Sequence, residues 1–157
     1  MTDSQHFNNK VAAITGAASG IGRALAQELA RRGAHLALCD VDETGLAETV
    51  NDCEGHGVKV SSQVLDVSDR VAVEAWADQV VADHGQVDLV FNNAGVALAA
   101  PVDEMTYEDL DWLLGINLWG VIYGTKAFLP HMKAAGTGHI VNISSVFGLI
   151  SIPSQSA

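Results

Sequence analysis

Short apolar segments alternate with longer amphipathic segments along this chain, and that alternation limits the folds open to it. The apolar segments have the length of buried strands and cover 11–14, 35–39, 58–65, 87–91 and 139–143. The segments between them show helical spacing, as Ile21, Leu25 and Leu29 do at every fourth position. Alternating strands and helices build right-handed βαβ units, so the sequence predicts a parallel sheet with helices on both faces.

The predicted fold is an α/β, Rossmann-like doubly wound parallel sheet of five strands in the order 3-2-1-4-5. Helices are expected over 21–32, 43–53, 69–84 and about 107–135, with Ser68 and Thr106 as N-caps of the last two. The chain has 157 residues without a linker or repeat, which predicts a single domain over 1–157. In such sheets ligands bind beyond the carboxyl ends of the strands, which makes the residues there the candidates for function.

The charge balance excludes whole classes of partner. Eight Lys and Arg residues against 19 Asp and Glu residues give a net charge of −11, whereas nucleic-acid binders need a basic surface. No apolar run approaches the roughly 20 residues of a membrane span, and residues 1–6 lack the regions of a signal peptide. We therefore expect a cytoplasmic protein with no nucleic-acid or membrane partner.

The residue types that bind metals or act as nucleophiles show no productive spacing. Cys39 and Cys53 form neither a disulfide framework nor a Cys-x-x-Cys pair, which predicts two buried thiols. The six histidines are scattered without ligand spacing. No metal site is predicted.

A glycine-rich turn joins the first predicted strand to the first predicted helix. Its glycines, Gly16, Gly20 and Gly22, have the spacing G-x-x-x-G-x-G. Glycine permits a close approach of backbone N–H groups to a pyrophosphate, and the helix that follows presents its positive N-terminus to that anion. Ser19 adds a hydroxyl donor and Ile21 opens the helix. The turn predicts a dinucleotide site, and the alternative is a tight turn without a ligand.

Asp40 closes the second predicted strand, 18 residues after Gly22. A carboxylate at this place can accept both hydroxyls of an adenosine ribose and would repel a 2′-phosphate. No basic residue stands near it in the sequence. NAD is therefore predicted in preference to NADP, and a helix cap or solvated turn acid is the alternative.

The third and fourth predicted strands end in further candidates for cofactor binding. Asp66 can pair with an adenine amine while Val67 supplies an apolar wall, although Asp66 could equally form an Asx turn. Asn93, Ala94 and Gly95 follow the fourth strand, where small residues allow a close approach to a ligand. The asparagine side chain can also tie neighbouring strands together through their backbones.

Two residues are candidates for catalysis. Ser145 follows the fifth strand, where its hydroxyl could polarise a substrate carbonyl, and an ordinary turn serine is the alternative. Asn117 stands inside the long predicted helix, where asparagine is unfavourable because its side chain competes for backbone hydrogen bonds. It is a candidate for binding a water molecule, with a satisfied buried amide as the alternative.

Together these motifs resemble those of the short-chain dehydrogenase/reductase family, from Lys10 to the end of the chain. The resemblance rests on the glycine-rich turn, on Asn92-Asn93-Ala94-Gly95, and on Asn117 and Ser145, which match two members of the family's Asn-Ser-Tyr-Lys set. It implies an NAD(P)-binding oxidoreductase that transfers a hydride between NAD(H) and an alcohol or ketone. Ser145 would then hold the substrate oxygen, and Asn117 would order a water in the proton relay.

The resemblance also implies that the chain is incomplete at its C-terminal end. The family's Tyr, its general acid and base, stands about thirteen residues after its Ser, which from Ser145 falls one position past Ala157. The tyrosines present, Tyr107 and Tyr123, lie upstream in the helix region. We therefore expect residues 1–157 to be inactive alone. The alternatives are a non-catalytic NAD-binding module or regulatory fragment, and a fragment without any ligand.

The expected partners follow from the same resemblance. A full-length parent would be a homo-oligomer that acts on a small alcohol or carbonyl compound. In residues 1–157 alone the fifth strand would form an unpaired edge and leave apolar surface exposed. We expect that polypeptide to self-associate or to need a partner.

Overall fold

The structure is a computed structural model that describes residues 6–150 of the chain. Within that range its strands are β1 Val11–Thr15, β2 His35–Asp40, β3 Val60–Val64, β4 Leu89–Asn92 and β5 His139–Asn142. Its helices are α1 Gly20–Arg31, α2 Glu43–Glu54, α3 Arg70–His84, α4 Tyr107–Leu114 and α5 Val121–Ala135. The prediction that the chain lacks a signal peptide rests on residues 1–6, and residues 1–5 lie outside the described range.

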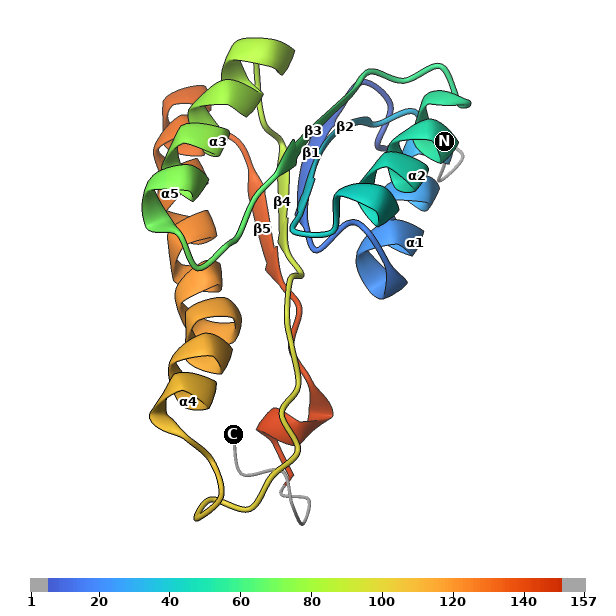
Figure 1. Cartoon of the computed structure of the whole chain (residues 1–157). Helices are drawn as coiled ribbons and strands as arrows, with labels where there is room; N and C mark the ends of the chain where they lie inside the picture. The colour runs from blue at the N-terminus through green and yellow to red at the C-terminus, as the bar shows by residue number, and fades with distance from the viewer. Residues whose placement is uncertain (1–5, 151–157) are drawn as a thin grey trace.

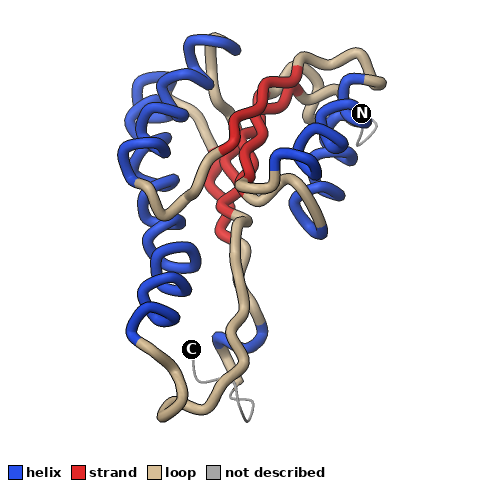
Figure 2. The backbone as a smooth tube through the Cα atoms, viewed as in Figure 1, coloured by secondary structure: helices blue, strands red, loops and turns tan. Residues whose placement is uncertain are grey.

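The strands form one parallel sheet in the order β3-β2-β1-β4-β5, which confirms the predicted fold class and strand order. β1 lies at the centre and pairs in register with β2, from Val11 opposite His35 to Thr15 opposite Cys39. The strands stand between two layers of helices (Figure 2). Helices α1 and α2 pack together on one side of the sheet, and α3 and α5 pack together on the other (Figure 1).

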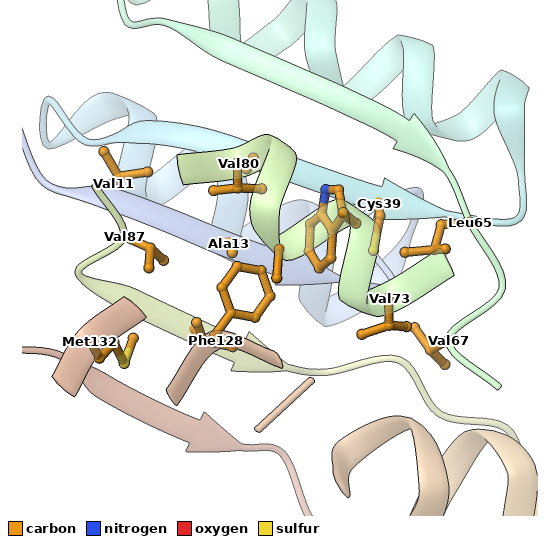
Figure 3. Packing of buried hydrophobic residues seen from close by; sticks show 14 residues of the cluster. Val11, Ala13, Cys39, Leu65, Val67, Val73, Val80, Val87, Phe128 and Met132 are labelled. Atoms are coloured by element: carbon orange, nitrogen blue, oxygen red, sulfur yellow. The ribbon is translucent and has the colours of Figure 1, made fainter. Parts of the chain in front are cut away.

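Alternate residues of each central strand fill one of two cores, as the period of two in a strand requires. In β1, Ala12 and Ile14 face α1 and α2, whereas Val11 and Ala13 face α3 and α5. The core on the side of α3 and α5, shown in Figure 3, contains an edge-to-face contact between Trp76 and Phe128, with ring centroids 5.2 Å apart. Such a pair contributes about 0.5–1.5 kcal/mol beyond the area it buries.

The predicted N-cap of α4 is confirmed, and the predicted N-cap of α3 is wrong. The Thr106 hydroxyl accepts from the Asp109 amide, and the Asp109 carboxylate accepts from the Thr106 amide, which makes a capping box. Helix α3 begins one residue later than expected, because Asp69 is its N-cap and accepts from the amides of Val71 and Ala72. The Ser68 side chain, predicted as this cap, instead donates to the Asp66 carboxylate.

The long helix expected over 107–135 is interrupted. Between α4 and α5 the chain forms a π-helical segment, η2, over Gly115–Gly120. Such segments are rare and often stand at functional sites, and this one carries Asn117. A short 3-10 turn, η3, covers Val146–Gly148 after β5. In the described part of the chain no helix is both long and apolar enough to cross a membrane.

Expressed alone, the 157-residue polypeptide is expected to self-associate at micromolar concentration. Within residues 6–150, β5 is an edge strand that pairs only with β4. The segment after it exposes five large apolar side chains: Ile143, Val146, Phe147, Leu149 and Ile150. Open strand edges and contiguous apolar patches promote association. Sedimentation velocity measures it, and replacing Leu149 and Ile150 by lysine should reduce it. A monomer with one cooperative melting transition would contradict the expectation.

Candidate functional site

The carboxyl ends of the strands surround one pocket of about 370 Å³. Its lining includes every predicted cofactor-binding residue except Gly22: Gly16, Ser19, Gly20, Ile21, Asp40, Asp66, Val67, Asn93, Ala94 and Gly95. Val41, Leu65, Val96 and Ile116 complete it. These residues come together because all carboxyl ends of a parallel sheet lie at the same edge.

The glycine-rich turn forms the floor of the pocket. Gly16 and Gly20 have φ values of 68° and 53°, where side chains other than glycine are strained. A Cβ atom on Gly16 would lie 2.8 Å from the Cα of Ala94, so the turn packs directly on the end of β4. Ser19 is the N-cap of α1, yet its side chain makes no capping hydrogen bond. Its exposed hydroxyl is therefore free to donate into the pocket.

Gly22 lies beneath the turn, away from the pocket lining. It is buried in the first turn of α1, and a Cβ atom there would lie 2.0 Å from the Gly16 carbonyl oxygen. The third glycine of the motif therefore permits α1 to pack against the turn. This role is mechanical, and it holds the helix N-terminus at the pocket.

Asp40 stands at the pocket wall with both carboxylate oxygens anchored. Oδ2 accepts from the Ala18 amide at 2.8 Å, and Oδ1 accepts from the Asp42 amide at 3.0 Å. The carboxylate is therefore part of a turn, as the alternative allowed, and it also faces the pocket. The cap of α2 is the neighbouring Asp42, which accepts from the Gly45 amide.

One basic residue is linked to Asp40 through the backbone of Ala18, although it does not line the pocket. Arg23, from the first turn of α1, donates to the carbonyl of the same Ala18 whose amide Asp40 holds. The fold brings these residues together across 17 positions of the chain. The guanidinium is engaged by Ala18, Gly45 and Glu48 on the side of α2.

Asp66 forms the Asx turn that the sequence left open, and it also lines the pocket. Its Oδ1 accepts from the Ser68 amide at 2.9 Å and from the Ser68 hydroxyl at 2.7 Å. Val67 is buried and supports η2, because a Cβ atom on Gly120 would lie 2.8 Å from its Cγ2.

Asn93 ties β4 to β1, as its position predicted. Its side-chain amide donates to the carbonyls of Thr15 at 2.9 Å and Gly16 at 3.2 Å. Thr15 completes the link and was missed in the sequence. Its buried hydroxyl oxygen accepts from the amides of Asn93 and Ala94, both at 2.9 Å. The signal was a hydroxyl residue at the end of an otherwise apolar strand.

Asn117 is exposed, so it is not the buried amide that one alternative described. Its Oδ1 accepts from the Val96 amide and its Nδ2 donates to the Val96 carbonyl, both at 2.9 Å. The side chain therefore pairs with both backbone groups of one residue, as a neighbouring strand would. It fixes the segment after β4, which lines the pocket, against η2.

Replacing Asn117 by aspartate is expected to lower the free energy of unfolding by about 1–2 kcal/mol. A carboxylate keeps the acceptor for the Val96 amide but loses the donor and faces the Val96 carbonyl. Chemical denaturation measures the change, and amide exchange at Val96 reports the loop. Asn51, an exposed residue of α2, provides the control because Asn51→Asp makes the same chemical change away from the pocket. Equal effects of the two substitutions would contradict the role of Asn117.

Ser145 lies outside the pocket lining, at the start of η3. It is exposed, and its Oγ accepts from the Phe147 amide at 3.1 Å. This is the turn serine that the sequence left as an alternative. A hydroxyl that accepts one hydrogen bond can still donate its proton, so Ser145 remains able to polarise an oxygen placed beside it.

A family model for short chain dehydrogenases matches residues 10–157. The chain belongs to this family. A short-chain dehydrogenase/reductase from Burkholderia phymatum, solved in complex with NAD, has 44% identity and a TM-score of 0.92 over 95% of this chain and 53% of its own. An NAD⁺-bound xylitol dehydrogenase has 36% identity and a TM-score of 0.92 over 96% and 58% of the two chains.

A Mycobacterium tuberculosis protein that carries the oxidoreductase name SadH is 56% identical over 96% of this chain and 55% of its own length. The chain thus spans about half the length of the curated relatives it matches. The resemblance to the short-chain dehydrogenase/reductase family is confirmed. The position of the family's Tyr relative to Ser145 stays a prediction.

The two cysteine thiols, Cys39 and Cys53, are buried and do not line the pocket. Burial, together with the negative charge of Asp40, raises the pKa of the Cys39 thiol. Burial, helped by Asp52, raises the pKa of Cys53 to about 11. Both thiols are buried and neutral, as predicted. Among residues 6–150, no group of three or more His, Cys, Asp or Glu side chains is arranged to hold a metal ion.

Proposed function

We propose that this chain is the cofactor-binding portion of an NAD-dependent oxidoreductase that interconverts a secondary alcohol and a ketone. The observation that carries the proposal is the placement of Asp40 and the glycine-rich turn on the same pocket. The turn offers backbone amides, the N-terminus of α1 and the Ser19 hydroxyl to a pyrophosphate. Asp40 offers anchored carboxylate oxygens to the ribose hydroxyls of the same dinucleotide.

The proposed adenine site lies between Asp66 and Val67, and the proposed nicotinamide site lies toward Asn93, Ala94 and Gly95. A nicotinamide bound there would supply the hydride chemistry. The protein's own contribution is to hold the dinucleotide in one orientation and to present polar groups to the substrate. We assign Ser145 to binding the substrate oxygen, and Asn117 to ordering a water from its position at the edge of the pocket.

The proposal includes three further expectations. The substrate is a small alcohol or carbonyl compound, the protein is cytoplasmic, and the full-length protein forms a homo-oligomer. Residues 1–157 alone are expected to bind NAD without turning over any alcohol. Two relatives were solved with NAD or NAD⁺ bound, which supports a nicotinamide cofactor for this chain.

Calorimetric titration of the full-length protein with NAD and NADP tests the cofactor. NAD should bind at least tenfold tighter, because hydrogen bonds to a charged group contribute about 1.5–3 kcal/mol. Formation of NADH with a panel of secondary alcohols, followed by absorbance, tests the reaction. Binding of NAD without turnover by the full-length protein would indicate a non-catalytic module. Failure to bind either dinucleotide would overturn the proposal.

A further inference from the structure

Asp40 and Arg23 hold the two backbone groups of the same residue, Ala18: Asp40 accepts from its N–H, and Arg23 donates to its carbonyl. The Ala18 amide donates to Asp40 Oδ2 at 2.8 Å. The Ala18 carbonyl accepts from both Nε and Nη2 of Arg23, with Nε at 3.0 Å. Two donors of one planar guanidinium on a single carbonyl fix the direction of the Ala18–Ser19 peptide unit, which adjoins the Ala17–Ala18 unit whose N–H donates to Asp40.

Arg23 is itself anchored to helix α2. Its Nη2 also donates to the Gly45 carbonyl at 3.2 Å and to the Glu48 carboxylate at 2.9 Å. A Cβ atom on Gly45 would lie 2.9 Å from the Ala18 carbonyl oxygen, so α2 approaches the turn closely only because this residue is glycine. The fully buried Thr49 hydroxyl donates to the neighbouring Ala17 carbonyl at 3.0 Å.

The carbonyls of Ala17 and Ala18 therefore point to α2, and the Ala18 amide points to Asp40. We propose that Arg23 is a positioning residue that sets the preference for NAD over NADP by holding the backbone of Ala18, and through it Asp40, in place. The inference rests on the proposed function, because it concerns the carboxylate to which that proposal assigns the ribose hydroxyls. Arg23 itself does not line the pocket.

The hydrogen bonds that Arg23 makes also reduce what its guanidinium can offer to NADP. A 2′-phosphate would need free donors of an arginine or lysine. Nε and Nη2 of Arg23 are committed to two carbonyls and a carboxylate on the α2 side. The residue thus acts on the discrimination only through Ala18 and Asp40.

The test is the ratio of the NADP dissociation constant to the NAD dissociation constant in Arg23 variants of the full-length protein. In Arg23→Gln the ratio should fall by about tenfold, since losing one charge-assisted hydrogen bond is worth about a factor of ten in an equilibrium constant. A released Asp40 would bind the ribose less well and repel a phosphate less. In Arg23→Lys, which keeps the charge but loses the fork, the ratio should fall less.

Arg31→Gln is the matched control, because Arg31 stands on the same helix and pairs only with Glu28 at the surface. It should leave both dissociation constants within about twofold. A merely structural role for Arg23 would weaken both cofactors equally and lower Tm without changing the ratio. An unchanged ratio in Arg23→Gln would overturn the inference.

Amide hydrogen exchange at Ala18, measured without cofactor, separates this inference from the proposed function. Arg23→Gln should speed exchange at Ala18 by about tenfold, while Arg31→Gln should not change it. If the unmodified protein shows no preference for NAD, the proposed function fails whatever the exchange result. If the protein prefers NAD but Ala18 exchange is unchanged in Arg23→Gln, the inference alone fails.

Discussion

Asp40→Ala is expected to weaken NAD binding by about 10- to 100-fold. The carboxylate is placed to accept two ribose hydroxyls, and hydrogen bonds to a charged acceptor contribute about 1.5–3 kcal/mol. NADP binding should improve, because a negative charge no longer faces the 2′-phosphate. Isothermal calorimetry on the full-length protein measures both changes. The substitution also orphans the Ala18 amide, so Tm should fall somewhat.

Asp52→Ala is the control for charge. Asp52 lies on α2, is exposed and accepts from Gln27, and it does not line the main pocket. Removing it changes the net charge by the same amount as Asp40→Ala but should leave both affinities within about twofold. The assignment of Asp40 would be wrong if the two variants changed NAD binding equally. It would also be wrong if the unmodified protein bound NAD and NADP alike.

The fold could be predicted because its main determinants are local and periodic. Apolar strands such as Val11–Thr15 and helices with four-residue spacing are visible without knowledge of distant contacts. The gathering of Gly16, Asp40 and Asn93 at one pocket followed from the parallel sheet alone. The family's motifs added the order of the strands, which alternation by itself leaves open.

The features that could not be predicted depend on which of several suitable side chains forms a given hydrogen bond. Ser68 and Asp69 are both good N-caps, and Asp69 caps α3 because Asp66 has engaged Ser68. The pairing of Asn117 with both backbone groups of Val96 was not visible in the sequence, although its oxygen and its nitrogen each keep a position for a water molecule. Arg23 stands far from Asp40 in sequence, and the two are linked only because the end of β2 places Asp40 against Ala18, the residue to which Arg23 donates. Each outcome depends on three-dimensional geometry.

Gly22→Ala is expected to lower the free energy of unfolding by about 3 kcal/mol or more. The added Cβ atom would lie 2.0 Å from the Gly16 carbonyl oxygen and 2.7 Å from Asn93 Nδ2. Neither neighbour can yield easily. The Gly16 oxygen belongs to a turn with positive φ, and Asn93 Nδ2 is bonded to the carbonyls of Thr15 and Gly16. Helix α1 must therefore move off the sheet, and the link between β1 and β4 must loosen.

Gly55→Ala is the matched control, since it adds the same methyl group at a place with room for it. Gly55 has a φ of −57°, and its Cβ atom would meet nothing closer than the Asp52 carbonyl at 3.4 Å. That substitution should be neutral or should stabilise the protein by about 0.4–1 kcal/mol through the unfolded chain. Urea denaturation of the full-length proteins measures both, and the NAD dissociation constant should rise only in Gly22→Ala. The affinity for NAD should change because α1 presents its N-terminus to the proposed pyrophosphate site. If the Gly22→Ala protein kept both its stability and its affinity for NAD, the contact between helix and turn would not be what holds the site.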